Sequence, residues 1–129
     1  MTAITVQGID HVVIRVTDMD RAIRFYTDVL GCIEERRVAG IGLVQLRAGR
    51  SLIDLLDAAE KPPAGVPNMD HLALRLETFN SDAIRAHLSK HGVDIGEEAT
   101  RYGAEGNGPS LYICDPDGNT VELKGPPNE

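Results

Sequence analysis

Two short segments of the chain repeat one pattern of apolar and polar residues. Residues 9–16 read IDHVVIRV and residues 69–76 read MDHLALRL, each with Asp-His followed by mostly apolar positions and an Arg. Both predict β-strands, in which successive side chains point to opposite faces. One face of each strand is then aliphatic and suited to pack against a helix. The other face carries a His and an Arg toward solvent or a cavity.

The similarity continues into a helix in each half of the chain. Both strands are followed by segments of helical periodicity in which Ala-Ile-Arg recurs. Asp18 in the first half, and Asn80 or Ser81 in the second, are typical helix N-caps because their side chains can accept bonds from unpaired backbone N–H groups. Gly31 and Gly92 suit the left-handed position that follows a helix end.

Each half then offers three further strand candidates, at 32–38, 41–47 and 51–57 in the first half and at 93–100, 110–115 and 119–125 in the second. The sequence DPDG at 115–118 suits a type I turn, so the strands beside it should form a hairpin. Residues 58–68 hold three of the seven prolines and predict a linker. The prediction is one α+β domain over 1–129, built from two tandem βαβββ modules at about 8–58 and 69–125 that pair about a pseudo-twofold axis.

Composition narrows the choice of partners. Of the 129 residues 42% are hydrophobic and 26% are charged, and the net charge of −7 argues against nucleic acid or an anionic membrane as the partner. The first residues lack the features of a signal peptide, and no apolar run approaches the ~20 residues that span a bilayer. We therefore expect a soluble, cytoplasmic protein that acts on a small molecule, with Cys32 and Cys114 as free, buried thiols.

The last strand of each half centres one carboxylate between two aliphatic residues. Asp54 stands in SLIDLLD and Glu122 in NTVELKG, each on the side opposite the helix. Pairing of the two modules would gather these carboxylates with His11 and His71 into a four-ligand metal site. Imidazole and carboxylate suit Zn²⁺, Ni²⁺ or Co²⁺, with Fe²⁺ or Mn²⁺ as alternatives. An octahedral ion would keep two positions for water or a chelating substrate.

Three other polar residues allow more than one interpretation. Arg15 shares a strand face with His11, and is either an exposed arginine or the anchor for a substrate carboxylate. His87 and His91 lie on the second predicted helix and have no counterpart in the first half. We interpret both histidines as surface or packing residues.

These motifs resemble the vicinal oxygen chelate superfamily of glyoxalase I, bleomycin resistance proteins and extradiol dioxygenases. The resemblance covers residues 8–125, with DHVVIRVTDMDRAIRFYTDVLG similar to the opening strand and helix and DPDGNTVEL to the closing hairpin. It implies that the modules curl into an open, incomplete barrel around a metal, with ligands at His11, Asp54, His71 and Glu122. The chain is most similar to bacterial-type glyoxalase I, a metal-dependent lyase (isomerase) of the hemithioacetal of glutathione and methylglyoxal, and small chains of that type are often homodimers.

The sequence departs from glyoxalase I at several positions. Asp54 replaces the usual Glu, and Ala58 replaces an Asn that helps to hold glutathione. Arg15 matches the arginine for the glutamyl carboxylate, and the other basic residues are reduced to Arg101. The glycine-rich segment RYGAEGNGPS (101–110), with Tyr102 and Asn107 as candidate substrate contacts, resembles a mobile loop over the site or is a plain flexible loop.

Several function classes remain open. The first is a glyoxalase-I-like isomerase, in which Glu122 would move a proton between adjacent carbons and the metal would stabilise an enediolate. An extradiol dioxygenase or an antibiotic-modifying thiol transferase would use three ligands, so Asp54 counts against both. A drug-sequestering protein would want aromatic walls, and aromatic residues are only 4% of the chain. A methylmalonyl-CoA-type epimerase also uses four ligands and proton transfer.

Overall fold

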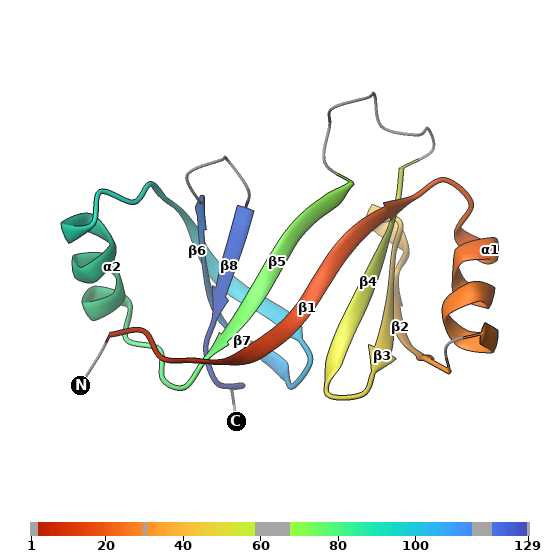
Figure 1. Ribbon diagram of the computed structural model, residues 1–129, viewed down its shortest axis with the longest axis horizontal. Coiled ribbons are helices and arrows are strands. Elements are labelled where there is room, and N and C mark those ends of the chain that lie inside the picture. The colour runs from red at the N-terminus through yellow and green to blue at the C-terminus, as the bar shows by residue number, and fades with distance from the viewer. Residues whose placement is uncertain (1–2, 30, 59–67, 115–119, 129) are drawn as a thin grey trace. The chain divides into compact units, whose positions relative to one another are not determined.

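The computed structural model describes residues 3–29, 31–58, 68–114 and 120–128. The chain divides into two compact units, one formed by His11–Asp70 and the other by Met1–Asp10 together with His71–Glu129. Figure 1 shows the elements of each. Strand β1 (Val6–Val16) begins in the second of these units and ends in the first.

The unit His11–Asp70 is a four-stranded sheet with one helix. After β1 come α1 (Met19–Arg24), which continues into a π-helical turn at Phe25–Val29, then β2 (Ile33–Val38), a 3-10 turn at Ala39–Ile41, β3 (Leu43–Ala48) and β4 (Ser51–Asp57). The strand order is β2-β3-β4-β1, with β1 parallel to β4 and the other pairs antiparallel.

The core of this unit lies between the sheet and α1. Val44, Leu46 and Leu55 are buried, and one aliphatic face of β1 packs on them with the residues of the helix. Asp18 caps the helix by accepting a hydrogen bond from the backbone N–H of Arg21. The aliphatic face predicted for β1 is therefore the face that packs under the helix.

The other unit repeats this plan. It contains β5 (Met69–Leu76), α2 (Ser81–Lys90), β6 (Ile95–Gly103), β7 (Gly106–Cys114) and β8 (Thr120–Lys124), in the order β5-β8-β7-β6, with β5 parallel to β8. Leu76, Ile84, Leu88, Leu111 and Leu123 form its buried core beneath α2. The Asn80 side chain caps α2. The α+β class and the two βαβββ modules are confirmed.

Two sequence predictions need correction. The segment 101–110 is a β-hairpin and no loop: β6 runs to Gly103, β7 begins at Gly106, and Gly103 pairs with Gly106. Its glycines make room for close neighbours, since a Cβ at Gly108 would lie 2.8 Å from the carbonyl oxygen of Pro126. Both cysteines were predicted to be buried, but Cys32 is only half-buried, and Cys114 is exposed because it ends the β7 ladder.

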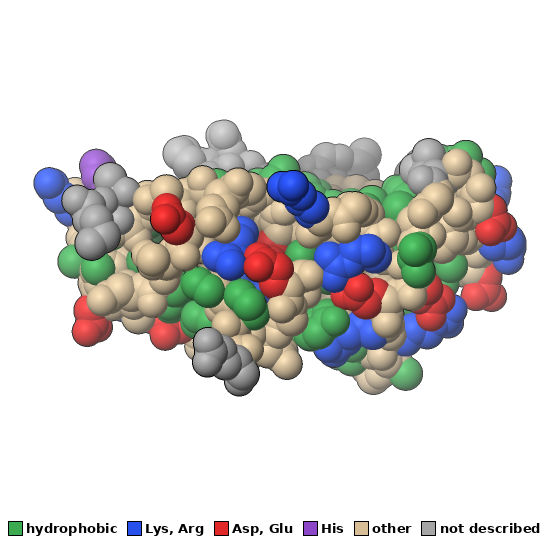
Figure 2. Space-filling view, turned by 90° about the horizontal axis from the view of Figure 1, so that it is seen from below, with side chains coloured by type: hydrophobic (Ala, Val, Ile, Leu, Met, Phe, Trp, Pro, Cys, Tyr) green, Lys and Arg blue, Asp and Glu red, His purple; other side chains and the backbone are tan. Residues whose placement is uncertain are grey.

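The predicted helix-end glycines and the predicted closing hairpin can also be compared with the structure. Gly31 and Gly92 have the predicted positive φ, at 79° and 69°. Strands β7 and β8 pair as the predicted hairpin, while its turn (115–118) and most of the 58–68 linker lie outside the described residues. Figure 2 shows Lys and Arg side chains interspersed with Asp and Glu on one face. Within the described part of the chain, no helix has the length and apolar character needed to cross a membrane.

Candidate functional site

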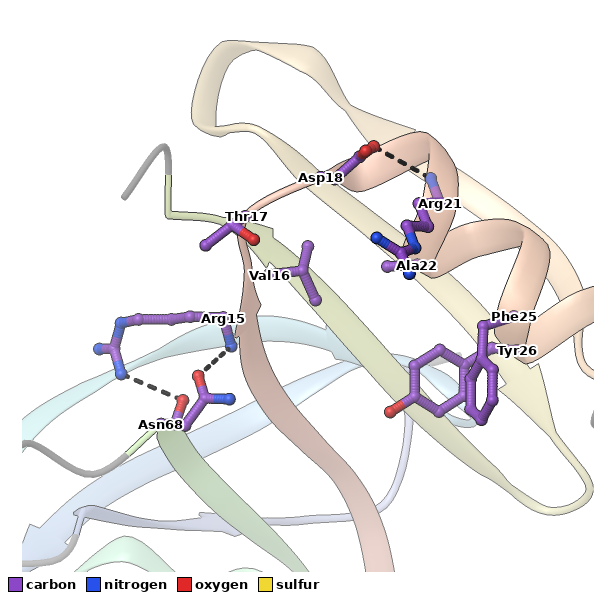
Figure 3. Close-up of a pocket in the computed structure, with 9 residues that line it drawn as sticks. All are labelled: Arg15, Val16, Thr17, Asp18, Arg21, Ala22, Phe25, Tyr26 and Asn68. Atoms are coloured by element: carbon purple, nitrogen blue, oxygen red, sulfur yellow. Dashed lines mark hydrogen bonds between the residues drawn. The ribbon is translucent and has the colours of Figure 1, made fainter. Parts of the chain in front are cut away.

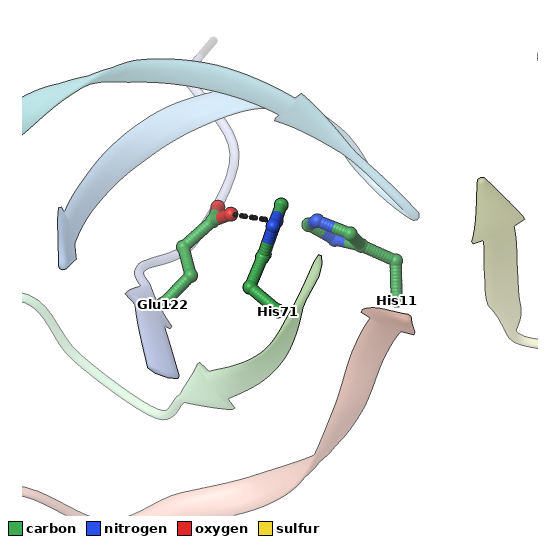
Figure 4. Close-up of side chains that lie close together, drawn as sticks. All are labelled: His11, His71 and Glu122. Atoms are coloured by element: carbon green, nitrogen blue, oxygen red, sulfur yellow. Dashed lines mark ion pairs between the residues drawn. The ribbon is translucent and has the colours of Figure 1, made fainter. Parts of the chain in front are cut away.

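The strongest candidate site residue is Glu122, on the face of β8 that points away from α2. Its side chain is 1% exposed and lies opposite Ala73 in the parallel β5–β8 ladder. One carboxylate oxygen, Oε1, is 3.1 Å from Nε2 of His71, two residues earlier on β5 (Figure 4). The structure therefore brings two predicted ligands of this unit together.

The second oxygen of Glu122 is held by a residue that the sequence analysis missed. Ser110 on β7 is fully buried, and its hydroxyl donates a hydrogen bond to Oε2 of Glu122 over 2.8 Å. Both carboxylate oxygens thus have neighbours, which fixes the orientation of the side chain. No sequence signal distinguishes this serine, because its contact depends on the register between β7 and β8.

Tyr112 borders the same pair. It lies opposite Glu122 in the β7–β8 ladder, and its ring meets the ring of His71 edge-to-face, with centroids 5.8 Å apart. Arg101 Nε donates a hydrogen bond of 3.2 Å to the phenolic oxygen. Burial and the nearby Glu122 charge raise the pKa of Tyr112 to about 12, although Arg101 opposes the shift, so the phenol is neutral at physiological pH.

A buried polar network connects this face to the β6–β7 hairpin. Lys124 is 1% exposed, and its ammonium donates a 2.6 Å hydrogen bond to the carbonyl of Arg101. Burial lowers the pKa of Lys124, while the nearby Asp10 and Glu122 charges act in the opposite direction. Asp10 is equally buried and accepts a hydrogen bond from the backbone N–H of Ala104, in the hairpin turn. The residue that precedes His11 is therefore anchored to the hairpin.

The unit His11–Asp70 carries the two other predicted ligands. His11 and Asp54 are both 3% exposed, and Asp54 lies opposite Val13 in the parallel β1–β4 ladder, the same relation that Glu122 has to Ala73. The side-chain amide of Gln45 on β3 donates a 3.0 Å hydrogen bond to Asp54. Gln45 is itself 3% exposed, and its carbonyl oxygen has no hydrogen-bond partner among the described residues.

Arg15, a predicted substrate contact, is held by an ion pair and by hydrogen bonds within its unit. Arg15 forms an ion pair with Asp70 at 2.5 Å and bonds Asn68 through its backbone and its guanidinium. It also borders a cavity of about 570 Å³ that the sequence did not predict, lined further by residues such as Arg21, Phe25 and Tyr26 (Figure 3).

Tyr102 and Asn107 form one pair of the β6–β7 ladder, and Asn107 is exposed. Its carbonyl oxygen accepts a 2.6 Å hydrogen bond from the backbone N–H of Asn128. The two residues that were expected on a mobile loop are thus held at fixed positions in a regular strand pair.

Comparison of the sequence with models of protein families identifies the superfamily of this chain. The profile of the glyoxalase/bleomycin resistance protein/dioxygenase superfamily matches residues 8–123. The chain belongs to this superfamily. It is 32% identical over 131 residues to the glyoxalase domain-containing protein RDO1 of Mycosarcoma maydis, covering 93% of this chain and 69% of that protein.

Solved structures share the vicinal oxygen chelate fold. Methylmalonyl-CoA epimerase from Mycobacterium tuberculosis superposes with a TM-score of 0.67 at 26% identity, covering 99% of this chain and 93% of that one. The Mn(II)-bound glyoxalase from Novosphingobium aromaticivorans gives 0.74 at 25% identity, covering 93% of this chain and 39% of that one. The predicted fold class is confirmed, and the superfamily includes proteins that bind a divalent metal.

The residues present fit a divalent cation. His71 and Glu122 lie in one unit and offer an imidazole and a carboxylate, with Nε2 and Oε1 3.1 Å apart, and both are donors that a metal ion takes. Glu122 is a nearly fully buried carboxylate, and burial of an anion is costly unless a cation or hydrogen-bond donors compensate it. An imidazole nitrogen beside a carboxylate oxygen is also the arrangement in which both can be ligands of one ion.

Proposed function

We propose that this chain is a metal-dependent lyase or isomerase of the glyoxalase type. It would move a proton between adjacent carbons of a small substrate that carries two vicinal oxygens, and a glutathione hemithioacetal is one candidate. The observation that carries the proposal is the buried Glu122 carboxylate, oriented by Ser110 and placed beside His71. A general base needs this kind of fixed position before its pKa matters.

One divalent ion would be held by His11, His71, Glu122 and Asp54, with Zn²⁺, Ni²⁺ or Co²⁺ as the first choices and Fe²⁺ or Mn²⁺ as alternatives. When bound, such an ion acts as a Lewis acid that draws electron density from the substrate oxygens. The imidazole of His71 and the carboxylate of Glu122, 3.1 Å apart in one unit, support two of these positions, and His11 is the repeat equivalent of His71. Asp54 is the fourth because its ladder position repeats that of Glu122.

Side chains of this protein would carry out the proton transfer and hold the reacting groups in place. Glu122 takes the proton from one substrate carbon and returns it to the next, and its longer side chain can reach further than that of Asp54. Ser110 orients the carboxylate through its 2.8 Å hydrogen bond. Asp54 stays fixed because Gln45 donates to it from the adjacent strand. Tyr112 accepts a hydrogen bond from Arg101 and packs its ring edge-to-face against His71 on the same face.

Substrate recognition is proposed to involve Arg15, Tyr102 and Asn107. Arg15 already pairs with Asp70, so a substrate carboxylate would share or replace this ion pair. Ala58 cannot supply the hydrogen bonds of an asparagine. We therefore expect poor activity on the glutathione hemithioacetal, or preference for another small substrate. A kcat/KM of ~10⁶ M⁻¹s⁻¹ or more, typical of a well-matched pair, would contradict this expectation.

The second candidate function is epimerisation of an acyl thioester. It is favoured by the similarity to the M. tuberculosis epimerase, which covers nearly all of both chains. Both reactions move a proton beside a carbonyl. Turnover measured separately with a hemithioacetal and with an acyl thioester would distinguish them. We also propose a homodimer. Static light scattering would test the assembly, and a monomer at micromolar concentration would contradict it.

The central experiment measures metal content and turnover in matched variants. A His11→Ala/His71→Ala protein should lose the ion that these residues hold, and the same metal content at this site as in the wild type would refute the ligand assignment. Glu122→Gln keeps the shape of the side chain and removes the base, so turnover should fall ~10²-fold or more at saturating metal. Asp54→Asn should instead weaken metal affinity and recover activity when metal is added. If excess metal restores Glu122→Gln and leaves Asp54→Asn inactive, the two roles are reversed.

A further inference from the structure

The four histidines of the chain fall into two pairs, and only one pair belongs to the proposed centre. His87 lies in α2 and His91 is the C-cap residue of that helix, four positions later. Their ring centroids are 4.7 Å apart and the rings are tilted by 56°. Both side chains are exposed, and within the described part of the structure neither imidazole takes part in a hydrogen bond or an ion pair.

We infer that His87 and His91 form a second site for a divalent transition metal, distinct from the centre that contains His71. Residues four apart on a helix lie on one face, one turn above the other. Each neutral imidazole offers a ring nitrogen, and metal–nitrogen bonds are ~2.0–2.1 Å long. The observed separation of 4.7 Å between the ring centroids leaves room for one ion shared by both rings. Copper should bind most tightly, and nickel and zinc less so.

The surroundings of the pair favour a solvent-accessible ion of moderate affinity. The last turn of a helix carries a partial negative charge, which attracts a cation. Ala83, one turn before His87, is exposed and small, so it leaves the approach open. Lys90 also lies in the last turn, and its charge opposes the ion. Water would fill the positions that the two imidazoles leave free.

The site can be separated from the proposed centre by two double variants of the full-length protein. His87→Gln/His91→Gln removes only the pair on α2, and His11→Gln/His71→Gln leaves only that pair. Cu²⁺ is titrated into metal-free protein, and the imidazole resonances are followed by NMR, because only four histidines contribute. The signals of His87 and His91 should broaden together. His11→Gln/His71→Gln should still bind one ion there, whatever happens at the other centre.

A third variant tests the spacing. Ala86→His combined with His87→Ala keeps the number of histidines and places the two imidazoles five residues apart, ~140° around the helix. Chelation by two linked groups raises affinity by ~10²-fold or more over either alone, so this variant should lose about that factor for Cu²⁺. Unchanged affinity in the spacing variant would overturn the inference. So would a His87→Gln/His91→Gln protein that binds as many ions as the wild type with the same affinities.

Discussion

Gly103 offers the sharpest test of the corrected hairpin. It ends β6 against two buried charged side chains. A Cβ at this position would lie well inside van der Waals contact of Asp10 Oδ2 and of Lys124 Cε, and 2.9 Å from Lys124 Cδ. Neither neighbour can move freely, because Asp10 accepts from Ala104 N–H and Lys124 donates to the Arg101 carbonyl. Gly103→Ala must therefore break one of these hydrogen bonds or displace the strand.

The expected loss of stability follows from those contacts. A buried polar group left without its hydrogen bond costs ~1–3 kcal/mol, and overpacking a close-packed site costs about the same. We expect Gly103→Ala to lower the free energy of unfolding by ~2–4 kcal/mol. At roughly 4 °C per kcal/mol for a chain of this size, Tm should fall by ~8–16 °C.

The matched control is Gly8→Ala, in the same unit on β1. A Cβ at Gly8 meets nothing within 4 Å, so the change should stay within ~0.5 kcal/mol of the wild type. Urea denaturation followed by circular dichroism compares the two variants. Equal midpoints for both would refute the close approach of Asp10 and Lys124 to Gly103. Rapid hydrogen exchange of the Ala104 amide in the wild type would also contradict it, because that N–H donates to a buried carboxylate.

Two further predictions concern residues beside the candidate ligands. Because the pKa of Tyr112 is raised to about 12, the contribution of this phenol to stability should be constant below pH ~10 and be lost between pH ~10 and 12, where the unfolded chain loses the phenol proton first. The phenolate absorbance should show a late titration step, and Tyr112→Phe should remove that step. Gln45→Leu removes the hydrogen bond that orients Asp54, so metal affinity should fall ~10–100-fold. Gln45→Asn keeps an amide on a side chain that is one methylene shorter, so its metal affinity should fall by a smaller factor. Equal metal affinity in Gln45→Leu and the wild type would contradict that role.

Much of the fold could be predicted because the first and last strands of each module have one aliphatic face that must be buried. Leu55 and Leu123 pack beneath the helices, so Asp54 and Glu122 between aliphatic neighbours had to face the other way. The equal ladder relations, Val13 with Asp54 and Ala73 with Glu122, then follow from the repeat. A shift of one residue would have turned every side chain to the wrong face.

The hairpin at 101–110 could not be predicted because glycine gives one signal for two situations. A flexible loop and a crowded strand both favour a residue without a Cβ. At Gly103 the second reason applies, since Asp10 and Lys124 fill the space of a side chain. Ser110 was missed for a different reason. Its bond to Glu122 depends on which residues of β7 and β8 stand close together, and no local pattern records that register.

The two modules also differ where their repeat makes them comparable. Gln45 stands opposite Asp54, and Tyr112 stands opposite Glu122, at the same step of the two ladders. An amide that donates to a short carboxylate holds it in one orientation, which suits a permanent ligand. Glu122 accepts from the Ser110 hydroxyl at one oxygen and lies 3.1 Å from His71 at the other, and its side chain has one more rotatable bond than that of Asp54 and reaches further. The duplication would thus supply equivalent backbone positions, and the neighbouring residues would divide the roles of ligand and base between them.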